Sequence, residues 1–138
     1  MRCGGVPGAG GRRGWLLAAV LLAPLAAQAA TATKAQEDAL RHLLASYERA
    51  IETKDLPLFR SVKPNLSSDE ERRLRKAFES TNSHEVAITV EGVDCQDARC
   101  VARLMRRDTL DRSIVSSFPQ VLRLNEGPAG WVIEEIGR

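Results

Sequence analysis

Apolar and polar residues alternate along two neighbouring stretches near the middle of the chain, and this pattern predicts a β-hairpin. In residues 84–91, every second position is apolar: Val86, Ile88 and Val90. Gly92 interrupts the alternation and the next apolar residues continue it in the opposite phase, which is typical of a β-bulge. After a turn at residues 96–99, a returning strand over 100–107 has two faces, one with Cys100, Ala102 and Leu104, the other with Val101, Arg103 and Met105.

Upstream of the hairpin, apolar residues recur every three or four positions, which predicts helices. The first helix is expected to end near Lys54, with an apolar stripe formed by Leu40, Leu43, Leu44, Tyr47 and Ile51. Pro64 closes a short second helix, and the third ends near Ser80 after Leu74, Ala77 and Phe78. Each helix follows a capping residue, two of them in capping boxes: Thr33 with Gln36, Asp55, and Ser67 with Glu70.

The third predicted helix carries a basic run, Arg72, Arg73, Arg75 and Lys76. An anion or nucleic-acid patch is one interpretation of such a run. A solvated helix face is the preferred one, because Asp69 and Glu71 stand four residues before Arg73 and Arg75 and can pair with them.

Two further strands are expected after the hairpin. Residues 108–113 form a polar connection, and 114–124 a strand in which Pro119 indicates an edge position or a bulge. A turn at 126–130 precedes a last strand over 131–136. Helices followed by an antiparallel meander predict an α+β fold, with the helices packed on one face of a sheet of about four strands.

The first 29 residues have the pattern of a secretory signal peptide. Basic residues precede a short apolar run over 15–27, and Ala27-Gln28-Ala29 fits a cleavage site, so we expect cleavage between Ala29 and Ala30. The run is short and contains Pro24, which disfavours an uncleaved anchor of ~20 residues. The pattern predicts export to the periplasm or the extracellular space, by a general or a twin-arginine route, and leaves residues 30–138 as a single domain.

Charge gives little indication of a partner. Loss of the arginines at 2, 12 and 13 with the leader would change the formal net charge from +2 to −1. A nearly neutral domain has no general electrostatic attraction to nucleic acid or to an anionic membrane. No stretch after residue 29 is apolar enough to span a membrane.

Cys95 and Cys100, one on each strand of the predicted hairpin, are expected to form a disulfide. The alternatives are a redox pair or a metal site. A redox dithiol normally has a two-residue spacer, and a metal site would need further ligands nearby, so neither is preferred and no metal or cofactor is expected. Because the closed loop is short, the bond would stabilise the fold by only about 2 kcal/mol.

The end of the first helix and the last strand resemble a known superfamily. The helix ends in Tyr-x-x-Ala-Ile-Glu-x-Lys-Asp-Leu over residues 47–56, a bent hairpin follows, and the chain closes on Gly-Trp-Val-Ile at 130–133. These features resemble the nuclear-transport-factor-2-like (SnoaL-like) superfamily over residues 34–136. The resemblance implies a cystatin-like cone, in which a curved sheet wraps the helices and leaves an apolar pocket at the open end.

The resemblance also implies where a ligand would bind. The candidate pocket residues are Tyr47, Arg103, Phe78 and Trp131. Enzymes of this superfamily, such as ketosteroid isomerases and dehydratases, hold a carboxylate or a His–Asp pair in the cone, and a tyrosine on the equivalent helix serves the isomerases as oxyanion donor. Here we expect Tyr47 to be a core aromatic residue, Arg103 to lie inside the cone or on its outer face, and His84 to be exposed or to cap a strand.

Three hypotheses of function follow. The preferred one is a non-catalytic binding or interaction module of the cell envelope, which could form a homodimer through the sheet face that carries Val101 and Met105. The alternative is a protein or isomerase-like enzyme that binds a small apolar ligand in the cone. It requires a void with at least two convergent polar side chains, rather than a cone filled by aromatic residues. The third is an accessory domain of a larger envelope assembly.

Overall fold

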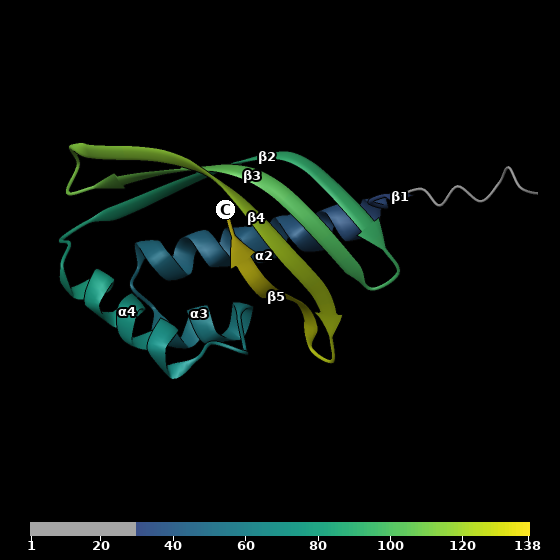
Figure 1. Ribbon diagram of the computed structural model, residues 1–138, viewed down its shortest axis with the longest axis horizontal. Helices are drawn as coiled ribbons and strands as arrows, with labels where there is room; N and C mark the ends of the chain where they lie inside the picture. Colours follow the sequence, from purple (N-terminus) through teal and green to yellow (C-terminus); the bar gives the residue numbers. More distant parts are fainter. Residues whose placement is uncertain (1–29) are drawn as a thin grey trace, which may run out of the picture.

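The computed structural model describes residues 30–138, so the predicted leader and its cleavage after Ala29 fall outside the described residues. Four long strands form one antiparallel sheet in chain order: β2 (His84–Gln96), β3 (Arg99–Leu110), β4 (Ile114–Gly127) and β5 (Gly130–Gly137). The two-residue strand β1 (Ala30–Thr31), which the sequence pattern did not predict, pairs with the end of β2. The long strands curve along their length (Figure 1).

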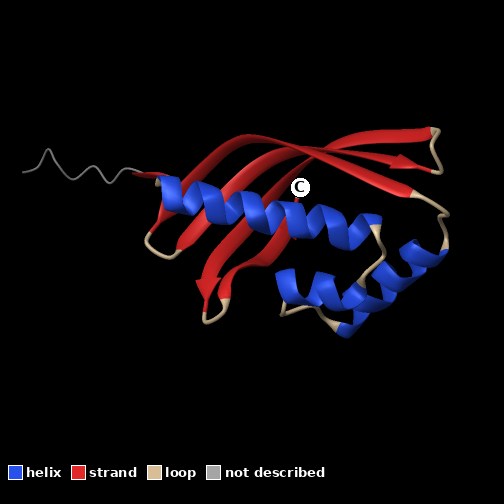
Figure 2. Ribbon diagram, turned by 180° about the vertical axis from the view of Figure 1, so that it is seen from behind, coloured by secondary structure: helices blue, strands red, loops and turns tan. Residues whose placement is uncertain are grey.

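Three helices lie on one side of this sheet (Figure 2). They are α2 (Lys34–Glu52), α3 (Leu56–Val62) and α4 (Ser68–Glu79), and each begins after its predicted cap. At α2, the Thr33 hydroxyl accepts from the Gln36 backbone N–H at 3.1 Å, while the Gln36 side chain accepts from the Thr33 N–H at 2.9 Å. The α+β architecture, with helices packed on one face of a curved antiparallel sheet, is therefore confirmed.

The core lies between α2 and the concave face of the sheet. Burial alternates along β3: Ala102 and Leu104 are 0 and 1% exposed and belong to the core, whereas Arg103 between them is exposed. The neighbouring strands β4 and β5 of the same sheet contribute three more fully buried side chains, Leu122, Leu124 and Ile133. Of the two faces that the alternation gave the returning strand, the one with Cys100, Ala102 and Leu104 is thus the face that packs against the helices.

Two bulges and a proline shape the sheet. The register shifts between Val90 and Gly92, as the broken alternation predicted, and again between Arg123 and Leu124. Pro119 pairs with Met105 on β3, whereas β5 pairs with β4 only from Val121 onward. Pro119 therefore sits where β4 is locally the edge of the sheet, which is the kind of position where a strand tolerates proline.

The hairpin of β2 and β3 ends in the cysteine pair. Cys95 and Cys100 are directly opposed in the ladder, and their sulfur atoms are 2.05 Å apart, the distance of a disulfide. Both side chains are buried at the end of the core next to β1.

The polar connection expected at residues 108–113 is wrong in its extent. Strand β3 continues to Leu110, and the turn takes only residues 111–113, where Asp111 and Arg112 have positive φ angles of 49° and 66°. The longer strand places Asp108 inside the sheet. Among the helices of residues 30–138, none is both long and apolar enough for a membrane span.

Candidate functional site

A cavity of about 490 Å³ opens where the three helices meet the sheet. Its apolar wall comes mainly from the helices and includes Ile51, Phe59, Leu66, Leu74 and Phe78. Its polar lining comes from both layers, with Tyr47, Lys63, Glu70 and Arg73 on the helical side and His84, Arg106 and Gln120 on the strands. The cavity therefore has an apolar body with polar groups at defined places, which is the usual composition of a small-molecule site.

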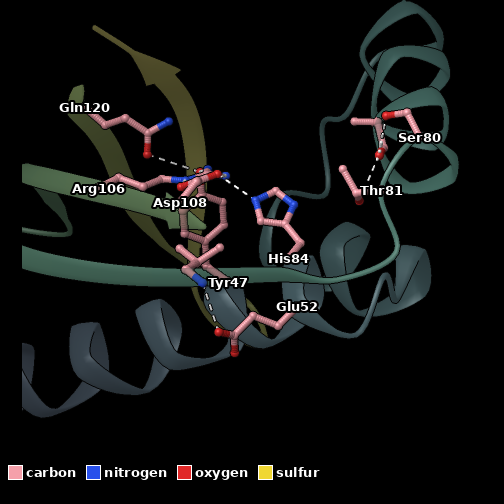
Figure 3. Close-up of polar contacts among 10 residues, drawn as sticks. Tyr47, Glu52, Ser80, Thr81, His84, Arg106, Asp108 and Gln120 are labelled. Atoms are coloured by element: carbon pink, nitrogen blue, oxygen red, sulfur yellow. Dashed lines mark hydrogen bonds and ion pairs between the residues drawn. The ribbon is translucent and has the colours of Figure 1, made fainter. Parts of the chain in front are cut away.

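The centre of the polar lining is an ion pair on β3. Arg106 and Asp108 follow Leu104 at every second position and therefore point to the concave side, as Leu104 does. The Arg106 guanidinium donates to Asp108 through Nε and Nη2, both at 2.6 Å (Figure 3). The two side chains are only 11 and 9% exposed, so little water reaches them and each charge is stabilised mainly by the other.

His84, the first residue of β2, joins this pair from the neighbouring strand. Its Nε2 lies 2.7 Å from Asp108 Oδ2, and its side chain is 11% exposed. Because an ionised carboxylate can only accept, Nε2 carries the proton in this hydrogen bond. The second ring nitrogen, Nδ1, has no hydrogen-bond partner within residues 30–138, and the imidazole lines the cavity.

Tyr47 extends the network to the opposite layer. This residue of α2 is 1% exposed, accepts from Arg106 Nη1 at 2.7 Å and donates to Gln120 Oε1 at 3.2 Å. The Arg106 guanidinium also lies over two aromatic rings, 5.6 Å from the centre of Tyr47 and 5.4 Å from that of Phe118. Figure 3 shows the five polar side chains converging from α2 and three strands: Tyr47, His84, Arg106, Asp108 and Gln120.

Burial and hydrogen bonding act in opposite directions on the two charges. Burial raises the pKa of Asp108, but the hydrogen bonds from Arg106 and His84 outweigh burial and hold this pKa below its ordinary value of 3.8. Burial also opposes the charge on Arg106, and the bonds to Asp108 and Tyr47 outweigh it, so the pKa of Arg106 is raised. Both groups are therefore ionised at neutral pH.

A second charged group stands on the helical wall. Lys63, at the end of α3, is only 4% exposed, and its ammonium lies 3.1 Å from Asn65 Oδ1 and 3.3 Å from Glu70 Oε2. Glu70 also accepts from the Ser67 backbone N–H at 2.9 Å, in the capping box of α4. These bonds hold the pKa of Glu70 below its ordinary value, with the backbone bond from Ser67 as the main cause.

The structure brings together two of the four side chains that the resemblance placed in the pocket. Tyr47 and Phe78 line the cavity. Arg103 lies outside it, with its side chain 51% exposed and paired to Asp94 at 2.7 Å. Trp131 is half-buried, packs against the core and is not among the lining residues.

Arg106, Asp108 and Gln120 were not singled out from the sequence, and His84 was expected to be exposed or capping. A signal for two of them was present. Extending the inward alternation of Cys100, Ala102 and Leu104 by four residues reaches Arg106 and Asp108. Arg106 lay within the strand predicted over 100–107, but the expectation of a polar loop over 108–113 kept Asp108 out of that strand. His84 and Gln120 come from separate strands, and only the pairing of strands brings them to Asp108 and Tyr47.

No protein-family model matches this sequence, and none of the curated proteins compared with it gives a significant match. Solved structures do resemble it. The Kfla4162 protein of Kribbella flavida superposes with a TM-score of 0.67 at 14% sequence identity, over 75% of this chain and 89% of that one.

Two further neighbours identify the type of fold. A putative dehydratase from the NTF2-like family of Streptomyces avermitilis has a TM-score of 0.63 at 12% identity, over 76% of this chain and 96% of that one. A designed NTF2 protein has a TM-score of 0.59 at 14% identity, over 73% of this chain and 96% of that one. At these identities the likeness concerns the fold, and on that basis residues 30–138 have the nuclear-transport-factor-2-like fold.

Proposed function

We propose that this domain binds a small organic molecule with an apolar body and a polar group that hydrogen-bonds in the Tyr47–His84–Gln120 corner of the cavity. The observation that carries the proposal is a buried, fully paired Arg106–Asp108 couple at the wall of a cavity of about 490 Å³. Apolar residues in place of a buried ion pair are often neutral or stabilising, so stability alone does not account for such a pair beside a void.

The network leaves specific hydrogen-bonding groups for a ligand. Asp108 is occupied by Arg106 and His84, and the Tyr47 hydroxyl is occupied by Arg106 and Gln120. What remains is the Nδ1 of His84 and the amide N–H groups of Gln120, since Gln120 uses its oxygen for Tyr47. These groups suit a carbonyl or hydroxyl group on the ligand.

The proposal moves from the interaction module preferred on sequence grounds to the alternative, a small-molecule site. The void and the convergence of polar side chains are the two conditions that the alternative required. The cysteine pair at disulfide distance supports the further inference of an oxidising compartment, and hence of export. An intact mass of the exported protein that begins at Ala30 would establish the cleavage; a mass that retains residues 1–29 would contradict it.

The binding proposal is tested with N-phenyl-1-naphthylamine, a neutral probe whose fluorescence rises in apolar cavities. We expect saturable binding of one molecule per chain to the protein purified after expression of the full chain. Ala77→Trp places an indole in the cavity and should abolish the signal, since Ala77 is an exposed residue that lines it.

The matched control is Ala45→Trp. Ala45 is likewise an exposed helical alanine, but it lines a separate groove of about 380 Å³ between α2 and β2. This variant should bind as the unmodified protein does. Absence of binding to the unmodified protein, or loss in Ala45→Trp instead of Ala77→Trp, would refute the proposal.

A second function, proton transfer at a carbon next to a carbonyl, is favoured by the His84–Asp108 contact of 2.7 Å. With Nε2–H donated to Asp108, the neutral imidazole has its lone pair on Nδ1 and can accept a proton, while the Gln120 amide can donate to the developing oxyanion. The test is deuterium exchange from D₂O into the methyl group of 1-acetonaphthone. His84→Gln should abolish exchange, whereas Ala45→Trp, outside the cavity, should leave it unchanged; no exchange above the rate in buffer would exclude this function.

A further inference from the structure

The acidic residues of α4 are not shared evenly among its arginines. Asp69 pairs with Arg72 rather than with Arg73, the partner that the sequence spacing predicted. Glu71 pairs with Arg75 at 2.8 Å, as predicted, and with Arg60 of α3 at 2.7 Å. Arg73 has no ion-pair partner within residues 30–138, and it is the arginine of this run that lines the cavity.

One turn before Arg73 on α4, Glu70 pairs with Lys63, the residue that ends α3. Lys63 is buried, and its ammonium has three N–H donors, of which Asn65 and Glu70 take two. Glu70 in turn is shared with the Ser67 N–H. Glu70, the one carboxylate that lines this wall, therefore already accepts from Lys63 and from the Ser67 N–H. It has no bond to Arg73, the second cation on the wall.

The whole lining has an excess of positive charge. Four basic side chains reach the cavity, Lys63, Arg73, Arg106 and Arg138, against Glu70 as the one lining carboxylate. Asp108 neutralises Arg106 through two hydrogen bonds and Glu70 pairs with Lys63, which leaves Arg73 on the helical side and Arg138 after β5 as the source of the excess. A concave, partly apolar surface strengthens the field of such charges and favours an anionic ligand.

Resting on the binding function proposed above, we infer that the ligand is an organic anion whose acid group, a carboxylate or sulfonate, lies against Lys63 and Arg73. Its apolar body then occupies the space between Phe59, Leu74 and Phe78, and its far end reaches the Tyr47–His84–Gln120 corner. Lys63 is bonded to Glu70, which precedes Arg73 by one turn of α4, and both cations line the cavity, so the two can share the oxygens of one acid group through charge-assisted hydrogen bonds. A neutral ligand would leave the excess charge uncompensated.

The inference is tested with two probes that differ by one acid group. N-phenyl-1-naphthylamine is neutral, and 8-anilinonaphthalene-1-sulfonate carries the same two aromatic groups and a sulfonate. We expect the sulfonate to bind about tenfold more tightly at low salt, and its affinity to fall as salt rises, while the affinity of the neutral probe stays constant.

Arg73→Gln should lower the affinity for the sulfonate probe by about five- to tenfold and leave the affinity for the neutral probe unchanged. Its matched control is Arg72→Gln, the neighbouring exposed arginine that pairs with Asp69 and does not line the cavity. The control should bind both probes as the unmodified protein does. Ala77→Trp, which occludes the cavity, should abolish binding of both and so exclude a surface site.

The outcomes separate the two proposals. Equal affinity for both probes, unaffected by Arg73→Gln, overturns the anion inference and leaves the binding function standing. An equal loss of affinity for the sulfonate probe in Arg72→Gln also overturns the anion inference, because the effect would then come from the net charge of the protein. Binding of neither probe overturns the binding function and the inference with it.

Discussion

Asp108 is the residue on which the buried network depends most. It accepts three hydrogen bonds, two from Arg106 and one from His84, and its own side chain is 9% exposed. Removing one member of a buried pair leaves the other charge uncompensated, at a cost of about 3–5 kcal/mol. We therefore expect Asp108→Asn to lower the free energy of unfolding by about 3 kcal/mol or more, measured by urea denaturation.

Asp94→Asn is the control, because Asp94 also bonds a strand arginine, Arg103, at 2.7 Å, but on the exposed outer face. An exposed ion pair contributes no more than about 1 kcal/mol. Similar losses in the two variants would mean that burial does not distinguish the two pairs.

The lowered pKa of Asp108 also fixes the direction of a pH effect. A carboxyl whose pKa is lower in the folded state than in the unfolded chain adds stability above its ordinary value of 3.8, and this stability is lost as pH falls through the folded value. The urea midpoint should therefore decrease from pH 6 to pH 3. The decrease should be smaller in Asp108→Asn, and an equal decrease would show that other carboxyls account for it.

At the scale of the elements, the strand alternation predicted most of the fold and part of the site. It grouped Cys100, Ala102 and Leu104 on one face, which the structure buries in the core, and it located the bulge at Gly92. Continued by four residues it reaches Arg106 and Asp108 too, but a charged residue on such a face does not indicate a buried site unless a partner for it is known. That partner information is three-dimensional, since His84 and Tyr47 are 24 and 59 residues away from Asp108 and Arg106.

Two glycines in the sheet should respond differently to alanine. Gly130, at the turn between β4 and β5, has φ +122°, a conformation that L side chains rarely adopt, so Gly130→Ala should destabilise by about 1–3 kcal/mol. At Gly92 a Cβ would overlap only the guanidinium of Arg103, the end of a flexible exposed side chain. Gly92→Ala should therefore lower stability by less than about 1 kcal/mol, the value of the exposed pair it disturbs. A larger loss at Gly92 than at Gly130 in thermal unfolding would contradict this ranking.

The cysteine pair closes a loop with a sequence separation of five, so its contribution should be modest. Reduction with dithiothreitol should lower the free energy of unfolding by about 2 kcal/mol and add two hydrogens to the intact mass. The double variant Cys95→Ser, Cys100→Ser serves as control and should not respond to the reductant. An unchanged mass and midpoint on reduction of the unmodified protein would mean that the thiols are free.

At the scale of the whole molecule, the homodimer predicted through the outer face of the sheet stays a prediction. Val101 and Met105 are half-buried there, and the exposed Arg103 and Arg123 are each paired with an acidic neighbour. If this face associates, Met105→Glu should shift a dimer to a monomer in sedimentation equilibrium. Val90→Glu, an exposed valine that lines the groove beside α2, should not. A monomer at every concentration of the unmodified protein would refute the dimer.

The two ends of the described chain differ in their position relative to the cavity. Residue 30 pairs opposite Cys95 in the ladder, at the end of the molecule away from α4, whereas Arg138 lines the cavity (Figure 1). An affinity tag or a surface linkage at the amino end therefore leaves the opening accessible to a ligand. The same tag at the carboxyl end would stand at the opening and compete with whatever the cavity accepts, so binding experiments on this protein call for amino-terminal immobilisation.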